Sequence, residues 1–242
     1  MKRKFFSSMV LLFFILVTVF ANDASAIPVT FDKLTGLTGG SPTLTGVYRA
    51  DLSSIDFDIL SISITDSSFG LGGATGQFSG FDLDAIMLST TSVNSASAAA
   101  ALPGLPVFDF STSGTFFTPG TQRVSIDPKL FGTDIHGAAV NNSVATLDSF
   151  DGNATTAIPG ADGFVSLGDG GILAFSLTSA VSTSGGLYLY IGEVGDNGEV
   201  AAGTIDVSDR PIAPVPEPST ILLMGIGLLG LVGYSRKRSK KS

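Results

Sequence analysis

The 242-residue chain contains no cysteine, no tryptophan and a single histidine, His136. Without cysteine it can form neither disulfides nor zinc–thiolate sites, and thiol catalysis is excluded. A Ser-His-Asp triad would have to use His136, and the nucleophile elbow Gly-x-Ser-x-Gly does not occur in the sequence. His136 lies in a stretch typical of an exposed loop. We therefore expect no enzymatic activity and no transition-metal site.

Basic residues are scarce between residues 27 and 210, where 19 acidic residues face only Lys33, Arg49, Arg123, Lys129 and Arg210. The resulting net charge of about −14 repels nucleic acids, which we exclude as partners. Charged residues make up 14% of the whole chain, below the ~25% that is usual for soluble domains. Glycine, serine and threonine are abundant instead. This composition is typical of an extracellular β-rich domain.

The first 26 residues show the three parts of a secretory signal peptide. Met1–Lys4 is positively charged, Met9–Phe20 is apolar, and Ala24 and Ala26 form a small-x-small cleavage site. We predict export through the secretion translocon and cleavage by signal peptidase after Ala26. An uncleaved N-terminal anchor is the alternative.

The other end of the sequence combines three further segments. Residues 208–219 form a proline-rich linker that contains Val215, Pro216, Glu217, Pro218 and Ser219. Residues 220–235 are uncharged and mostly apolar, and residues 236–242 are basic, beginning with Arg236, Lys237 and Arg238. This order resembles the PEP-CTERM sorting signal of Gram-negative bacteria. The resemblance implies processing by an exosortase-like membrane protease and a setting in extracellular polysaccharide, biofilm or matrix.

We predict that residues 220–235 form a transmembrane helix with its basic end in the cytoplasm, as the positive-inside rule requires. The uncharged stretch Thr220–Tyr234 would span about 22 Å as a helix, less than the ~30 Å of a bilayer core. Its marginal length favours a transient anchor in the inner membrane over a permanent one. The Gly225-x-Gly227-x-x-Gly230 pattern within it lacks the strand, helix and acidic residue of a dinucleotide site.

Residues 27–207 are predicted to form an all-β domain, an antiparallel β-sandwich of possible jelly-roll type, because apolar and polar residues alternate along many short stretches. Strands are expected at residues 55–65, 81–88, 107–110, 124–126 and 171–178, with a bulge at Ile59–Leu60. Leu187–Val194 and Val200–Val207 are expected to form a hairpin across Gly195–Gly198. Residues 92–106 are expected to form a long loop with one helical turn.

Acidic residues in turns leave two interpretations open. Asp151, Asn153, Asp196 and Glu199 are oxygen-rich candidates for calcium, yet Asp and Asn next to Gly also simply form turns. No complete calcium-loop spacing occurs in the sequence, so no cofactor is assigned. The pairs Asp56/Asp58 and Asp82/Asp84 could serve acid–base chemistry, or could belong to an exposed polar strand face.

Together these features predict an exported, non-enzymatic protein of the cell surface or extracellular matrix. The alternatives are a carbohydrate-binding module and, as a third reading, a carboxylate-dependent glycan hydrolase.

Overall fold

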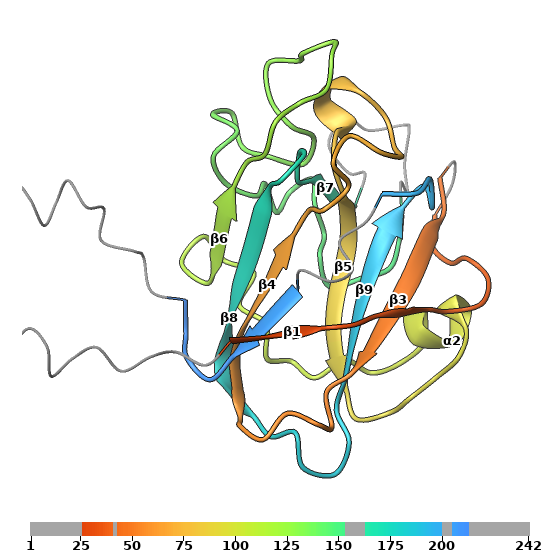
Figure 1. Cartoon of the computed structure of the whole chain (residues 1–242), viewed down its shortest axis with the longest axis vertical. Helices are drawn as coiled ribbons and strands as arrows, with labels where there is room; N and C mark the ends of the chain where they lie inside the picture. The colour runs from red at the N-terminus through yellow and green to blue at the C-terminus, as the bar shows by residue number, and fades with distance from the viewer. Residues whose placement is uncertain (1–25, 41–42, 153–162, 200–204, 213–242) are drawn as a thin grey trace, which may run out of the picture. The chain divides into compact units, whose positions relative to one another are not determined.

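The computed structural model describes residues 26–40, 43–152, 163–199 and 205–212 of the chain. Within these ranges the strands assemble into two antiparallel sheets that pack on each other (Figure 1). Helical structure among these residues is limited to one short α-helix and one 3-10 turn. The prediction of an all-β antiparallel fold is confirmed. The signal peptide at 1–26, apart from Ala26, and the helix predicted at 220–235 lie outside the described residues.

Each sheet contains five described strands, and strands from distant parts of the sequence alternate within it. The first sheet has the order β1 (Ala26–Val29), β10 (Ile205–Ser208), β4 (Ile59–Thr65), β8 (Ile172–Val181), β6 (Thr115–Thr118). The second sheet has the order β2 (Asp32–Lys33), β3 (Thr45–Asp51), β9 (Tyr188–Val194), β5 (Asp82–Ser89), β7 (Val165–Ser166).

Both sheets therefore contain strands from either side of the predicted loop at residues 92–106. In the first sheet β4 precedes this loop and β8 follows it, and the two strands are hydrogen-bonded neighbours. In the second sheet the same holds for β5 and β9. Because every central pairing joins the two halves of the sequence, the halves cannot fold as separate lobes.

The core lies between the two sheets and follows from the two-residue periodicity of the strands. In β9, Leu189 and Ile191 contact the inter-sheet core, whereas Tyr190 between them packs on the outer face of the second sheet. Ile62 of β4 and Phe175 of β8 meet the β9 side chains from the first sheet, and both are fully buried. Each such side chain stabilises the fold by roughly 1.5–3 kcal/mol through its removal from water.

The outer face of the second sheet is covered by the helix α2 (Ala96–Ala100). Ser95 caps this helix by accepting a hydrogen bond from the backbone N–H of Ala98 at 3.3 Å. Ala96 and Ala99 are fully buried in a cluster with Tyr190. A helical turn was expected in this alanine-rich stretch, and α2 is that turn.

The bulge predicted at Ile59–Leu60 is confirmed, because the pairing of β4 with β8 shifts register between Ile59 and Ser61. The predicted hairpin is wrong. β9 pairs with β3 and β5, whereas β10 pairs with β1 and β4 in the other sheet. The chain crosses between sheets after β9 and does not turn back on it.

Two other predicted strands are loops in the structure. At residues 107–110 only a single bridge from Phe108 to Leu177 forms. Asp109 accepts a hydrogen bond from the N–H of Ser111 and starts a turn there. Val124 and Ile126 are 83% and 72% exposed, so that stretch has no buried face to support a strand.

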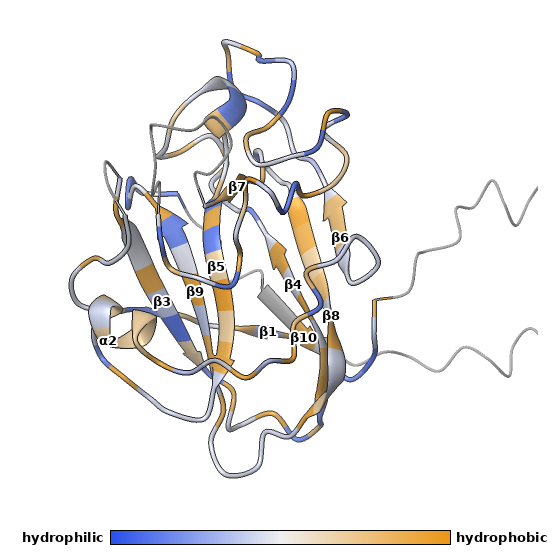
Figure 2. Ribbon diagram, turned by 180° about the vertical axis from the view of Figure 1, so that it is seen from behind, coloured by the Kyte–Doolittle hydropathy of each residue, from blue (hydrophilic) through white to orange (hydrophobic). Residues whose placement is uncertain are grey.

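One end of the sandwich is polar. Figure 2 shows hydrophilic segments at the adjoining ends of β5 and β9, close to β7, whereas the opposite ends of these strands are apolar. Asp82 begins β5, and Glu193 is the penultimate residue of β9. This end of the sandwich contains the group of charged residues described next.

Candidate functional site

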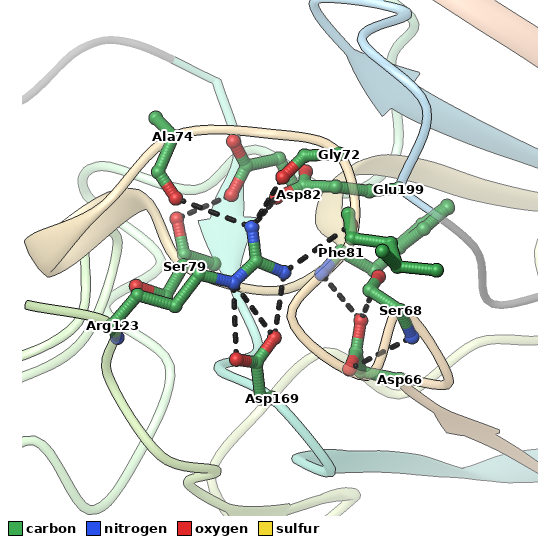
Figure 3. Close-up of polar contacts among 12 residues, drawn as sticks. Asp66, Ser68, Gly72, Ala74, Ser79, Phe81, Asp82, Arg123, Asp169 and Glu199 are labelled. Atoms are coloured by element: carbon green, nitrogen blue, oxygen red, sulfur yellow. Dashed lines mark hydrogen bonds and ion pairs between the residues drawn. The ribbon is translucent and has the colours of Figure 1, made fainter.

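Arg123 is the centre of a polar network at this end of the sandwich (Figure 3). It lies in the loop between β6 and β7, and its side chain is only 12% exposed. Its Nε donates to both carboxylate oxygens of Asp169 at 3.0 Å, and its Nη2 donates to Oδ1 at 2.6 Å. This two-pronged geometry is the strongest arrangement available to an arginine and a carboxylate.

The guanidinium also fastens a glycine-rich loop, residues 66–76, to the sandwich. Its Nη1 donates to the carbonyl oxygens of Gly72 and, at 3.4 Å, Ala74. The beginning of the same loop is held by buried Asp66, which accepts from the N–H groups of Phe81 at 2.9 Å and Gly170 at 3.0 Å. The loop is therefore fixed at both ends by charged hydrogen bonds.

Three buried carboxyl groups lie next to this loop, from Asp82, Glu193 and Glu199, which are 4%, 0% and 3% exposed. Asp82 accepts a hydrogen bond from the Ser166 hydroxyl at 2.5 Å. Among the residues that the structure describes, none donates a hydrogen bond to the four carboxylate oxygens of Glu193 and Glu199. Arg123 Nη1 lies 3.6 Å from Glu199 Oε1. Buried polar atoms are nearly always hydrogen-bonded, so these four oxygens require a physical explanation.

Burial and mutual repulsion perturb the acidities of these groups. Burial first, and the nearby Glu199 charge second, raise the pKa of Glu193 to about 8. Burial also raises the pKa of Glu199 to about 8, against the opposing effect of Arg123. The pKa of Asp82 is raised well above its usual range by burial first and by Glu199 second. Full ionisation of this cluster is therefore unfavourable without an added positive charge.

Another buried carboxyl group, that of Asp84, lies in the second sheet. Asp84 accepts from the Thr45 hydroxyl and from the N–H of Gly152, whose nitrogen lies 2.9 and 3.0 Å from its two oxygens. Burial raises the pKa of Asp84 to about 7, despite these hydrogen bonds. Asp151 accepts from the Thr146 hydroxyl at 3.0 Å, and its buried Oδ1 has no hydrogen-bond partner within the described ranges.

Three of the four calcium candidates predicted from the sequence belong to the described residues. Asp151 lies beside Asp84, and Asn153 lies outside the described residues. Asp196 forms an ion pair with Lys33, and Glu199 faces Arg123. Within the ranges the structure describes, no three His, Cys, Asp or Glu side chains stand close enough to hold a metal ion between them.

The sequence did not reveal that Asp82 and Asp84 are buried. On an exposed polar strand face, both side chains would be in water. They are 4% and 0% exposed, whereas Asp56 and Asp58 are exposed as that interpretation requires. Arg123 was missed as well. The sequence feature that could have pointed to Arg123 is its rarity, because it is one of only five basic residues between 27 and 210.

His136 lies in an exposed turn, where its backbone N–H donates to Asp134 Oδ1 at 3.2 Å.

A cavity of about 320 Å³ lies beside β5 and α2. Its walls include Met87, Phe108, Phe110 and Phe150, with Asp148 as a polar group. Phe108 and Phe110 stack on each other with ring centres 5.6 Å apart. Its volume falls in the range of small-ligand pockets, about 300–1,000 Å³.

Comparison with known proteins identifies one segment. The family model of the PEP-CTERM protein-sorting motif matches residues 214–238, so the sorting signal predicted from the sequence is confirmed. The match contains Pro216, Glu217, Pro218 and the basic cluster from Arg236. No curated protein and no solved structure matches the chain. Among the residues described by the structure, no helix is long and apolar enough to cross a membrane.

Proposed function

We propose that this chain is an exported, non-enzymatic surface or matrix protein whose β-sandwich is delivered and then released by processing of its sorting signal. The match to the PEP-CTERM motif at residues 214–238 carries the proposal. The signal peptide directs residues 27–212 across the inner membrane, and the helix at 220–235 holds them there. An exosortase-like protease then cuts near Pro216–Pro218, and the host is a Gram-negative bacterium.

The fold supports processing at this position. β10 ends at Ser208, and the N–H of Ile212 donates to the Ser176 hydroxyl of β8 at 3.2 Å. All the described strands therefore lie before the motif. A cut near Pro216 would remove no hydrogen-bonded strand among them, so it would leave the sandwich intact.

The predicted signal-peptidase cut is also compatible with the first sheet, in which β1 pairs with β10. Cleavage after Ala26 would leave Ile27 as the first residue, and Ile27 pairs with Val207 of β10. The strand order, with β10 between β1 and β4 and β9 between β3 and β5, supports a sandwich of the jelly-roll class. The domain would thus keep its N-terminal strand tied down after both cuts.

The structural or adhesive role is supported by the acidic, hydroxyl-rich composition and by the setting that the sorting motif implies.

Fractionation of the native host tests the proposed processing of the sorting signal. Replacing Pro216, Glu217 and Pro218 by alanine should keep the protein in the inner membrane. Pro211→Ala, outside the motif, should be processed as the wild type is. Normal release of the triple variant would refute the proposal.

Carbohydrate binding is the second candidate, because the cavity beside α2 offers stacked phenylalanine rings and one carboxylate. Aromatic faces and a few polar groups are what a sugar site uses. A glycan array probed with the mature protein and with Phe110→Ala tests it. Binding that the substitution abolishes would support this function. Glycan hydrolysis lost on Asp148→Asn would instead indicate an enzyme.

A further inference from the structure

We propose that Glu193 and Glu199 are ligands of a calcium ion at the polar end of the sandwich, between the end of β9 and the glycine-rich loop 66–76. The four carboxylate oxygens carry the inference. They are buried, and no group in the described part of the chain donates a hydrogen bond to them; only Glu199 Oε1 has a cation nearby, Arg123 Nη1 at 3.6 Å. An isolated carboxylate removed from water without a partner is strongly destabilising, and buried charges are normally paired or bound to metal ions.

Both side chains are held in place by rigid structure. Glu193 sits in the central strand β9 and pairs with Gly46 of β3 and Leu83 of β5. The Glu199 carboxylate occupies the space beside the α-carbon of Gly73, where any Cβ would overlap it. Glycine at 73 therefore leaves room for the carboxylate. A site with fixed ligands loses little conformational freedom when it binds an ion.

The positive charges nearby are shared with other carboxylates. Arg123 forms its two-pronged pair with Asp169 and also lies 3.6 Å from Glu199 Oε1, and Lys33 pairs with Asp196. Asp82 adds a third buried carboxyl group within electrostatic reach of both glutamates. Within the described part of the chain, the cluster therefore has more acidic groups than cationic ones. A bound divalent cation would balance this excess.

The chemistry of the donors selects calcium. The ligands are carboxylate oxygens, which suit a hard cation, and the chain has no cysteine. Since no third acidic side chain completes the site, carbonyl oxygens and water must supply the remaining ligands. Calcium accepts six to eight oxygens in irregular geometry, whereas magnesium requires a near-ideal octahedron. Two carboxylates predict weak binding, with a Kd of about 10⁻⁴–10⁻³ M, as in extracellular modules.

Calcium titration of the EDTA-treated mature protein tests the site. At a hundredfold excess over Kd, the Tm should rise by about 5–10 °C. The Glu193→Gln/Glu199→Gln variant should lose this shift and, without calcium, be at least as stable as the wild type. Asp109→Asn, which removes an exposed charge elsewhere, should keep the full shift. No shift in the wild type, an equal shift with magnesium, or a shift that persists in the double variant would each overturn the site.

Terbium luminescence provides a second readout that does not depend on the double variant folding. The chain has no tryptophan, and Tyr48 lies within electrostatic reach of Glu193. Tb³⁺ in the site should therefore show tyrosine-sensitised emission that calcium displaces and that Tyr48→Phe greatly reduces. Emission unchanged in Tyr48→Phe or in Glu193→Gln would place the ion elsewhere and refute the proposal. Neither experiment involves the sorting tail, so the proposed function is judged separately.

Discussion

Replacing Arg123 by methionine would remove the centre of the polar network while keeping a long side chain in its place. Asp169 would lose three charged hydrogen-bond contacts, and the loop 66–76 would lose the bonds to the Gly72 and Ala74 carbonyl oxygens. Glu199, whose side chain is fully buried, would also lose the cation at 3.6 Å. The perturbation therefore combines lost hydrogen bonds with an uncompensated buried acid.

The magnitude follows from the exposure of the partners. Removing one member of a fully buried ion pair costs about 3–5 kcal/mol. The side chains of Arg123 and Asp169 are 12% and 22% exposed, so water can partly solvate the carboxylate that remains. We expect the free energy of unfolding to fall by about 3 kcal/mol. Because Arg123 lowers the pKa of Glu199, the loss should be greater at pH 9 than at pH 6.

Urea unfolding monitored by circular dichroism, in EDTA at both pH values, measures this loss. Arg49→Met is the matched control, since Arg49 is similarly buried. It donates to Ser92, Val93 and Asn94 at 2.8–2.9 Å. The control should lose clearly less than Arg123→Met, because these three acceptors are neutral and the ion pair of Arg49 with Asp32, at 4.0 Å, involves an exposed carboxylate. A loss below 1 kcal/mol for Arg123→Met, or one as small as that of the control, would refute the central role of Arg123.

Two further substitutions test the buried acids and the glycine-rich loop. In Asp84 the folded-state pKa of about 7 exceeds the ordinary 3.8, so its contribution to stability is greatest below pH 4 and is lost as the pH rises through 7. This contribution is at most about 4 kcal/mol. In unfolding measurements made from pH 4 to 8, Asp84→Asn should remove it and leave the pH dependence due to Asp82, Glu193 and Glu199. Gly73→Ala should cost several-fold more than Gly36→Ala, because both glycines have positive φ but only at Gly73 would the Cβ overlap Glu199. Equal melting temperatures for the two alanine variants would contradict this account of the loop.

The strands were predictable where apolar residues recur with the period of a pleated strand. Strands were expected at residues 55–65 and 81–88 for this reason, and the structure has β4 at Ile59–Thr65 and β5 at Asp82–Ser89. The bulge at Ile59–Leu60 was visible as a slip in that period. Which strands pair with each other was not predictable in the same way. The turn residues Gly195–Gly198 favour a hairpin locally, but β10 gains more by lying between β1 and β4 in the other sheet.

The polar end was less predictable than the fold. Asp82 alternates with apolar residues as a solvent-facing acid would, and nothing local to it reveals that Ser166 lies against it, 84 residues away. Glu193 and Glu199 were visible only as acids in a turn-rich stretch. The surroundings of Glu199 include Gly73 and Arg123, which approach from separate loops. Local patterns could not encode these long-range contacts.

The central claim is that the sandwich is exported and that its sorting tail is removed. Mass spectrometry of the mature protein from its native host tests this most directly. We predict a chain that begins at Ile27, ends near Pro216–Pro218 and is recovered from the cell surface or the medium. An intact chain from Ile27 to Ser242 in the inner membrane would contradict the account.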